Sequence, residues 1–397
     1  MPSDSRSPSR PAAPAGRKRQ IASPHPMKGA ILGYGFIASQ GHLPAWQRRA
    51  LSHGDLEIVA VADRCEARRA LAHQALPAAR IYADHRSLLA AEGTSLDFVD
   101  ICTPPSEHAC LTHDALDRGL HVLCEKPMAV SAKEAASMIA HAQLARRVLM
   151  PCHNYLHAPV IRAVREVLDS GLIGRVHALT LDTFRPTHAR GVAEWSPDWR
   201  RDRHWSGGGI AMDHGPHTLY LAFDWMNSLP TSVSARTFTD PSGKLDTEDT
   251  WVATLTFPTG LASAFLTWKA GLRKGVFTIH GDRGAIVIND DELQIVAADA
   301  PAGGPASTTR PRTGRLSVPS DCQDARHSAW FEPIWPQFLD AIAADRFVGK
   351  DALDAVRTIQ VIEAAYVSAA HAGQQCPLDL AQPLAVQRPR LLASVTA

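Results

Sequence analysis

The apolar residues in the first third of the chain form short continuous runs separated by longer, helix-like segments. Runs without polar alternation are typical of parallel strands that are buried on both faces of a sheet. Strands are predicted at 29–32, 57–62, 80–82, 98–102, 121–124 and 148–152, and helices at 107–118 and 132–146 among others. This order of elements predicts an α/β fold with a doubly wound parallel sheet over residues 27–155.

Beyond residue 155 the pattern becomes one of alternation. In 251–257 the side chains of Trp251, Ala253, Leu255 and Phe257 alternate with valine and threonine, and a Pro-Thr-Gly turn leads into a strand at 261–268. Further strands are predicted at 175–184, 276–280, 285–288 and 293–297, and helices at 159–170, 210–225, 334–344 and 352–370. These elements predict a second, α+β domain over 156–373. Its large, open, mostly antiparallel sheet would cover its helices with one face and leave the other for solvent or a partner subunit.

Three segments show neither the continuous apolar runs nor the apolar–polar alternation described above. Residues 1–26 are rich in proline, serine, alanine and arginine, and we expect a disordered tail. Their basic patch Arg17-Lys18-Arg19 precedes no apolar stretch, so a secretory signal is not expected. Residues 298–325, rich in proline, glycine, serine and threonine, are predicted to be a surface loop, and 374–397 a C-terminal extension.

Composition narrows the class of protein. A net charge of +1 over 397 residues argues against a general attraction to nucleic acid or anionic membranes. No apolar run approaches the roughly 20 residues that cross a bilayer. The seven cysteines are scattered without a C-x-x-C pair, which favours reduced thiols in a cytoplasmic protein over a disulfide framework or a metal site.

The first motif follows the first predicted strand and reads Gly33-Tyr34-Gly35-Phe36-Ile37-Ala38. In such a turn the first glycine permits the tight bend, and the second lets the backbone approach a pyrophosphate. The helix that follows offers its N-terminal N–H groups to phosphate. The motif therefore predicts a dinucleotide site.

Residues that end the later strands extend this site. Asp63 ends the second strand, where an acid binds the adenosine ribose hydroxyls and favours NAD, whereas the adjacent Arg64 could hold the 2′-phosphate of NADP. An alternative role for Asp63 is to cap the next helix. Thr103 and Pro104 end the fourth strand and His108 opens the next helix, so we expect all three near the cofactor.

A second and a third motif carry candidate chemistry. Glu125-Lys126-Pro127 puts a lysine at the ligand-binding edge of the sheet, and both Glu125 and Lys126 are expected at the cofactor. Behind three glycines comes Asp213-x-x-x-His217 on a predicted helix, whose spacing would place both side chains on one face. A histidine suits proton transfer near neutral pH.

The three motifs in this order resemble the Gfo/Idh/MocA oxidoreductase family. The resemblance runs from about Met27 to the final helices and implies a Rossmann domain followed by an open mixed or antiparallel sheet. It implies NAD(P)-dependent chemistry at a carbinol carbon of a sugar, polyol or related compound, in a homodimer or homotetramer joined through the C-terminal sheet. By the same resemblance Lys126 is the active-site lysine, Asp213 the aspartate that orients the base or binds a substrate hydroxyl, and His217 the catalytic histidine.

Further residues are candidates for substrate contact. These are Asn154, Arg185, Arg203 and His204, together with Asp213 and His217, while Trp195, Trp199 and Trp205 could stack on a sugar ring or pack in a core. Histidines are frequent in this region, but none has the tight spacing of metal ligands, so no metal is expected.

Two other functions remain open on the sequence. Some relatives in the family cleave glycosides by transient oxidation and recycle the cofactor, which would make the chain an NAD-using hydrolase. A cofactor-sensing regulator that has lost turnover is the other, although Lys126 and His217 together favour an enzyme.

Overall fold

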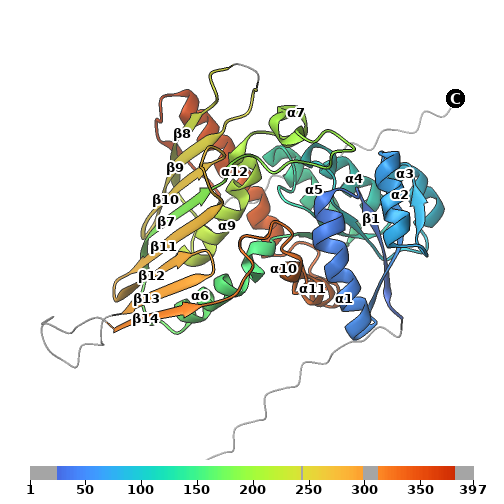
Figure 1. Cartoon of the computed structure of the whole chain (residues 1–397), viewed down its shortest axis with the longest axis horizontal. Coiled ribbons are helices and arrows are strands. Elements are labelled where there is room, and N and C mark those ends of the chain that lie inside the picture. The colour runs from blue at the N-terminus through green and yellow to red at the C-terminus, as the bar shows by residue number, and fades with distance from the viewer. Residues whose placement is uncertain (1–24, 243–244, 298–311, 381–397) are drawn as a thin grey trace, which may run out of the picture.

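The computed structural model describes residues 25–242, 245–297 and 312–380, which build two β-sheets with helices packed against them (Figure 1). The first sheet has six parallel strands in the order β3-β2-β1-β4-β5-β6. Their bounds are β1 Met27–Leu32, β2 Leu56–Ala62, β3 Arg80–Tyr82, β4 Phe98–Ile101, β5 His121–Cys124 and β6 Leu149–Pro151. The order reverses direction at β1, as in the Rossmann fold, so the predicted doubly wound sheet is confirmed.

Helices cover both faces of this sheet because its strands are apolar on both sides. Alternate strand residues such as Ile31 and Phe98 pack on α1 (Leu43–His53), α2 (Glu66–Ala75) and α11 (Ile334–Ala343). The residues between them, such as Ala30 and Val99, pack on α3 (His85–Glu92), α4 (Pro105–Asp117), α5 (Ala132–Ala145) and the first half of α12 (Lys350–Ala370).

The second sheet has nine strands in the order β14-β13-β12-β11-β7-β10-β9-β8-β15. Neighbouring strands are antiparallel except β7 and β10, which confirms the expected mostly antiparallel sheet. The bounds are β7 Val176–Phe184, β8 Ser232–Phe238, β9 Thr250–Phe257, β10 Gly260–Thr267, β11 Lys274–Gly281, β12 Gly284–Asn289, β13 Glu292–Ala297, β14 Arg312–Ser317 and β15 Cys376–Pro377.

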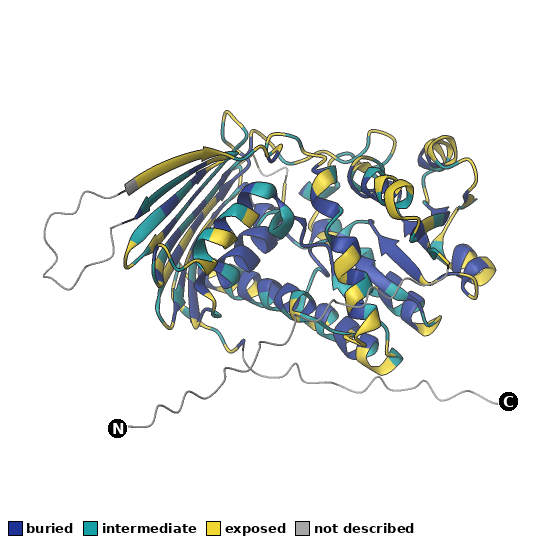
Figure 2. Ribbon diagram, turned by 90° about the horizontal axis from the view of Figure 1, so that it is seen from below, coloured by how far each residue is buried: buried dark blue, intermediate teal, exposed yellow. Residues whose placement is uncertain are grey.

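One face of the second sheet packs on helices, and Figure 2 shows these helices between the sheet and the first domain. They are α6 (Pro159–Asp169), α8 (Ile210–Asp213), α9 (Gly215–Met226) and the second half of α12. The other face carries exposed apolar side chains, including Val252, Leu261 and Phe265. The short helices α7 (Arg203–Ser206) and α10 (Ser328–Phe331) lie in the segments between β7 and α8 and between β14 and α11.

The last helices join the two domains rather than closing the second one alone. On α11, Trp335 and Phe338 pack against Phe98 of the first sheet, with ring centroids 5.0 and 5.9 Å from that of Phe98. Along α12, Val356 lies in the core of the first sheet and Ile362 in that of the second. The apolar residues of α12 thus pack into the cores of both domains. The domain boundary predicted at 155/156 therefore does not separate these last helices from the first domain.

Other expectations differ in detail from the structure. Part of the predicted loop 298–325 is wrong, because 312–317 forms β14 and pairs with β13 along its whole length. Residues 298–311, the tail up to residue 24 and the extension beyond 380 lie outside the described residues. Within the described part of the chain, no helix is both long and apolar enough to cross a membrane.

Candidate active site

A cavity of about 420 Å³ lies at the carboxyl ends of the parallel strands, where the second domain closes over them. Its first-domain wall includes the turn after β1, the end of β2 and the residues that follow β4 and β5. Its second-domain wall includes Asp213 and His217 from the start of α9 and the segment before it. The three motifs of the sequence therefore meet around one space.

The turn after β1 is shaped for close approach by a ligand. Gly33 has a φ of +88°, and a Cβ there would lie 2.8 Å from Thr103 Cγ2. A Cβ on Gly35 would meet no atom within 4 Å, so the space beside this residue belongs to the cavity. The Thr103 hydroxyl, also at the cavity wall, is buried without a hydrogen-bond partner. A bare backbone beside an unpaired hydroxyl fits a dinucleotide cofactor.

The helix after this turn opens with a wide turn at Ala38–His42 before it becomes α1. The N–H of Leu43 donates to the oxygen of Ala38, five residues back rather than the four of an α-helix. The next residue, Pro44, has no N–H to donate. This turn places His42 in the interior of the protein, next to Asp100 of β4 and Glu125, the residue after β5.

Asp63 lies at the cavity wall, as expected, and is held by the main chain. Its Oδ2 accepts from the N–H of Tyr34 at 2.6 Å and its Oδ1 from that of Cys65 at 2.7 Å. The second of these bonds closes the turn before α2, but the N-cap residue of that helix is Cys65 and it has no side-chain cap, so the alternative capping role of Asp63 is not formed. Arg64 also lines the cavity, but it pairs with Glu107 and lies over Trp195 and Trp205.

Two predicted cofactor residues have other positions. The Tyr34 side chain is buried in the core rather than in the cavity, so only its backbone belongs to the turn. His108 is also buried, with Nε2 2.8 Å from the oxygen of Thr103 and Nδ1 2.9 Å from that of Pro127. It fixes the loops behind the cavity wall. Phe36 and Ile37, by contrast, line the cavity with Pro104, Glu125 and Lys126.

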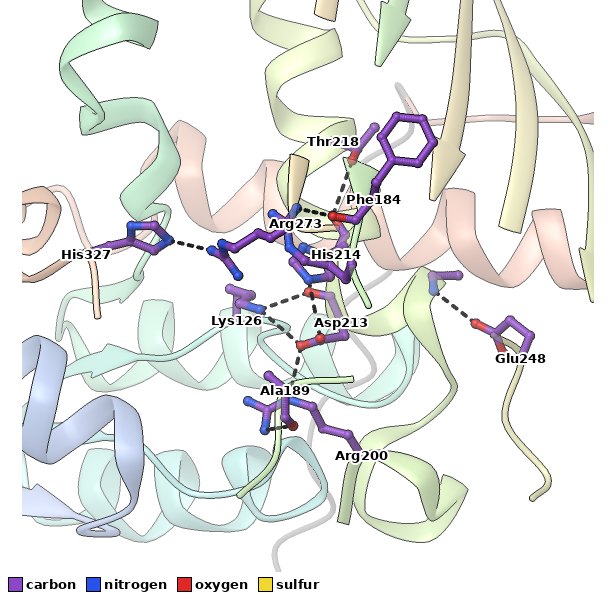
Figure 3. A network of polar contacts seen from close by, with 12 residues as sticks. Lys126, Phe184, Ala189, Arg200, Asp213, His214, Thr218, Glu248, Arg273 and His327 are labelled. Atoms are coloured by element: carbon purple, nitrogen blue, oxygen red, sulfur yellow. Dashed lines mark hydrogen bonds and ion pairs between the residues drawn. The ribbon is translucent and has the colours of Figure 1, made fainter. Parts of the chain in front are cut away.

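Lys126 reaches across to the second domain (Figure 3). Its Nζ donates to the main-chain oxygen of Asp213 at 2.8 Å and lies 3.4 Å from Asp213 Oδ1. Arg200 Nε donates to the same Oδ1 at 3.3 Å. Burial alone would raise the pKa of Asp213, but Lys126 and Arg200 hold it well below its usual value. Asp213 therefore stays ionised and fixes two cations at the cavity.

The expected pairing of Asp213 with His217 is not formed. The predicted helix 210–225 breaks at His214, because Pro216 begins a new helix, α9, and leaves Asp213 at the end of α8. His217 instead has its Nδ1 2.7 Å from the hydroxyl of Tyr220, one turn along α9. That hydroxyl also accepts from the N–H of Tyr155 at 3.3 Å.

His217 is fixed on a second side by stacking. The Tyr155 ring lies on it with centroids 4.0 Å apart and an angle of 23° between the planes. With Nδ1 engaged by Tyr220, Nε2 is the ring nitrogen left for the cavity. Burial, and then the charge of Lys126, hold the pKa of His217 well below its usual value, so the ring is neutral at neutral pH.

The four other predicted substrate residues divide into two groups. Asn154 lines the cavity, and Arg185 lies behind its wall, where its Nη1 donates to the oxygens of Phe184 and Lys274 at 2.7 and 3.0 Å. Arg203 and His204 do not line it. Arg203 donates to the oxygen of Asp246 at 3.1 Å, and His204 is exposed on α7. Both point away because α7 turns its polar side to solvent.

Several cavity residues were missed by sequence reasoning. They are Tyr155, Arg200, His214, Arg273, His327 and Phe331. Trp195 and Trp199 also line the cavity, in agreement with one of the two roles expected for the tryptophans. Tyr220 could have been found, since it lies three residues after His217 on a helix. The others come from connecting segments without periodicity.

A fully buried charge cluster lies under the cavity wall. His42 Nδ1 is 2.9 Å from Asp100 Oδ2, and Nε2 is 2.9 Å from Glu125 Oε1. Burial by itself would lower the pKa of His42, but the two carboxylates raise it to about 10. His42 is thus an imidazolium between two carboxylates. Glu125 in turn accepts from the N–H of Lys126 at 3.0 Å, which places the cluster directly behind the lysine.

The chain matches two family models. Residues 27–153 match the oxidoreductase family with an NAD-binding Rossmann fold, and residues 161–287 match the GFO/IDH/MocA C-terminal domain. Together the two matches cover both domains and all three motifs.

Similar proteins include sugar dehydrogenases. D-apiose dehydrogenase of Paraburkholderia graminis is 38% identical over 147 residues, 37% of either chain, and D-glucoside 3-dehydrogenase of Escherichia coli is 31% identical over 216 residues, 54% of this chain and 58% of that one. Levoglucosan dehydrogenase of Pseudarthrobacter phenanthrenivorans is 28% identical over 248 residues, 54% and 61% of the two chains. The matches thus span less than two thirds of each of these relatives.

The fold agrees with solved structures. A levoglucosan dehydrogenase solved in complex with NADH superimposes with a TM-score of 0.77 over 89% of this chain and 100% of that one, at 22% identity. The sequence matches to both domains and the shared fold lead to one conclusion: this chain belongs to the Gfo/Idh/MocA family of oxidoreductases.

Proposed function

We propose that the chain is an NAD-dependent dehydrogenase that moves a hydride between the nicotinamide and a carbinol or carbonyl carbon of a sugar or polyol. The observation that carries the proposal is the convergence of three groups on one cavity. The glycine turn, Lys126 and His217 come from separate parts of the chain, and all line the same space.

His217 is the proposed acid and base. Oxidation of an alcohol needs a group that accepts the hydroxyl proton while the hydride leaves the carbon. A neutral His217 that carries its proton on Nδ1 and donates it to the Tyr220 hydroxyl can accept the substrate proton at Nε2. Stacking on Tyr155 fixes the direction in which Nε2 points.

Lys126 is the proposed electrostatic partner. An ammonium beside the reacting oxygen stabilises negative charge that develops on an alkoxide, or polarises a carbonyl in the reverse direction. Its bonds to Asp213 hold the Nζ between the domains rather than in solvent. In this proposal Asp213 orients Lys126, and not His217.

The cofactor would lie with its pyrophosphate at Gly33 and Gly35 and its adenosine ribose at Asp63. A carboxylate at that position favours NAD, and the pairing of Arg64 with Glu107 supports NAD over NADP. When bound, the nicotinamide supplies the hydride acceptor. One relative, from Haloferax volcanii, is named an NADP⁺-dependent D-xylose 1-dehydrogenase, so both cofactors belong in the test.

The test is the absorbance of reduced nicotinamide when purified protein is mixed with NAD or NADP and a panel of inositols, aldoses and glycosides. A signal with one substrate class that His217→Ala abolishes, while NAD still binds, supports a dehydrogenase. Release of an aglycone without net NADH would instead identify the cofactor-recycling hydrolase. Binding of NAD with neither reaction would favour the sensor.

Assembly and location are part of the proposal. The exposed apolar residues Val252, Leu261 and Phe265 on the outer sheet face support a homodimer or homotetramer through that face. Light scattering of wild-type protein and of Phe265→Asp tests it, and a monomeric wild type would refute it. The seven cysteines are all free, which supports a cytoplasmic protein and is checked by cell fractionation.

A further inference from the structure

Arg273 is a cavity residue that pairs with no carboxylate in the part of the chain that the structure describes. It lies just before β11 and lines the cavity with Lys126 and His217. Its Nε donates to the main-chain oxygen of Cys322 at 3.2 Å, and its Nη2 lies 3.2 Å from His327 Nε2. Both contacts are with uncharged groups, since burial and Arg273 itself lower the pKa of His327 to about 3.

A second guanidinium lies behind the first. Arg185 is only 7% exposed, and its Nε is buried with no hydrogen-bond partner among the described residues. Its Nη1 bonds to two main-chain oxygens, one of them that of Lys274, the residue after Arg273. Burial, and then this neighbouring charge, lower the pKa of Arg273. Among the described residues, no carboxylate forms an ion pair with either guanidinium.

The carboxylates nearby are already committed. Asp213 faces Lys126 and Arg200, and Asp290 pairs with Lys274 at 3.3 Å. Glu125 at the cavity wall is bound to the His42 imidazolium. A buried guanidinium next to a partly buried one, with no carboxylate paired to either among the described residues, is unfavourable, and proteins retain such an arrangement where a ligand supplies the anion.

The position of Arg273 separates this site from the phosphates of the cofactor. Its partner His327 lies against Tyr155, with ring centroids 5.8 Å apart, and Tyr155 stacks on His217. Figure 3 shows Arg273 beside His214 and Lys126, among the residues of the second domain. The pyrophosphate turn at Gly33 belongs to the first domain.

We infer that the substrate carries an oxyanion, a carboxylate or a phosphate, and that Arg273 binds it while Lys126 and His217 face the reacting carbon. Arg185 reinforces the positive charge from behind. The inference rests on the proposed dehydrogenase and narrows its substrates from sugars and polyols in general to sugar acids or sugar phosphates. Guanidinium groups are suited to either anion because their N–H groups match two oxygens at once.

Matched pairs of compounds test the inference. D-Glucose is compared with D-glucuronate and D-glucose 6-phosphate, and D-galactose with D-galacturonate, both in turnover with NAD and in calorimetric binding to the NADH-saturated protein. We expect at least one of the two anion types to have a KM and a Kd about 10- to 100-fold lower than its neutral parent, the range of a charge-assisted contact. Preference for the uronates identifies a carboxylate, and preference for the phosphate identifies a phosphate.

Variants assign the effect to Arg273. Arg273→Gln should remove the preference for the anion, read as the ratio of the KM values of the neutral parent and its anion within the same variant, whereas Arg273→Lys should retain part of it. Lys269→Gln is the matched control, because it removes a positive charge that faces Asp240 rather than the cavity. It should leave the preference intact.

The outcomes are separable from those of the proposed function. Turnover of neutral sugars as good as that of the anions would keep the dehydrogenase and overturn the anion site. A loss of NAD affinity in Arg273→Gln, with no change in substrate preference, would also overturn it by assigning the arginine to the cofactor. Anion binding that depends on Arg273, without nicotinamide chemistry in either direction, would support the anion site and refute the dehydrogenase.

Discussion

The ammonium of Lys126 donates a hydrogen bond to the main-chain oxygen of Asp213 at 2.8 Å, and this contact joins the end of the parallel sheet to the second domain. The donor follows β5 and the acceptor ends α8, so the reactive end of the cavity is built from both domains. Neither sheet alone places the lysine beside His217.

Replacing this lysine should separate chemistry from cofactor binding. Lys126→Met removes the charge at the reacting oxygen, and we expect kcat to fall about 10²- to 10³-fold, as when an electrostatic donor is lost. The Kd of NAD, measured by fluorescence titration, should change little. Lys133→Met on the exposed side of α5 is the control. A fall in NAD affinity equal to the fall in kcat would show that Lys126 serves the cofactor instead.

The plot of kcat/KM for oxidation against pH should lack an acid limb at the usual pKa of histidine. Because burial and Lys126 depress the pKa of His217, the base stays unprotonated and active well below about pH 6.5, the usual histidine value. The acid limb of kcat/KM should therefore lie at lower pH. In Lys126→Met the limb should move upward, although burial keeps it below the usual value. A wild-type limb at about pH 6.5 would contradict this.

The buried imidazolium of His42 should make stability depend on alkaline pH. Its pKa of about 10 in the folded protein exceeds the unfolded value of about 6.5, so its stabilisation is complete below about pH 6.5 and lost as the pH rises toward about 10. His42→Asn leaves two carboxylates buried without the cation, which costs about 3–5 kcal/mol of unfolding free energy near neutral pH.

Urea denaturation of wild type and His42→Asn measures this difference at neutral and at alkaline pH. The gap between the two proteins should shrink at the higher pH, because the wild-type ring loses its proton there. His53→Asn, on the exposed end of α1, should show no such trend. A gap that is independent of pH would mean that His42 is neutral and serves only packing.

Two glycines allow the effect of backbone strain on stability to be distinguished from an effect on NAD binding. Gly33 and Gly54 have φ angles of +88° and +65°, but a Cβ would meet Thr103 at 2.8 Å only at Gly33. Alanine at either position should cost about 1–2 kcal/mol of stability through the left-handed conformation. Only Gly33→Ala should also raise the Kd of NAD, by about 10-fold or more, because it displaces the turn. Equal NAD affinity in the two variants would refute the proposed pyrophosphate site at Gly33.

The parts of the molecule that are encoded locally could be predicted from the sequence. The buried strands, the turn at Gly33 and the position of Lys126 depend on neighbouring residues, and their patterns show directly. The helix break before His217 was also visible, since Pro216 lies inside the predicted helix, but the 3.6-residue periodicity on either side outweighed it. Local patterns thus indicated the turn at Gly33, Lys126 and His217, which line one cavity, while their roles in cofactor binding and catalysis stay predictions.

The remainder depends on contacts between distant segments. Arg273 precedes an ordinary strand, and nothing around it in the sequence indicates a ligand. Its proposed role follows from the three-dimensional structure, in which no described carboxylate pairs with it. His42, Asp100 and Glu125 come from three separate elements that only the parallel sheet brings together. Strand β14 follows a segment of low apolar content and is fixed by its pairing with β13 rather than by its own composition.

The shared helix α12 has a consequence for synthesis on the ribosome. Val356 and Ile359 cover one face of the nucleotide-binding sheet, and the oxygen of Phe347 accepts from the N–H of Leu149 on its edge strand. A nascent chain cannot finish covering that face of the sheet until nearly all of the second domain has emerged. We therefore expect a ribosome-stalled chain ending at residue 330 to be protease-sensitive throughout its first domain, and protection of that domain in such a chain would show that the two halves fold independently.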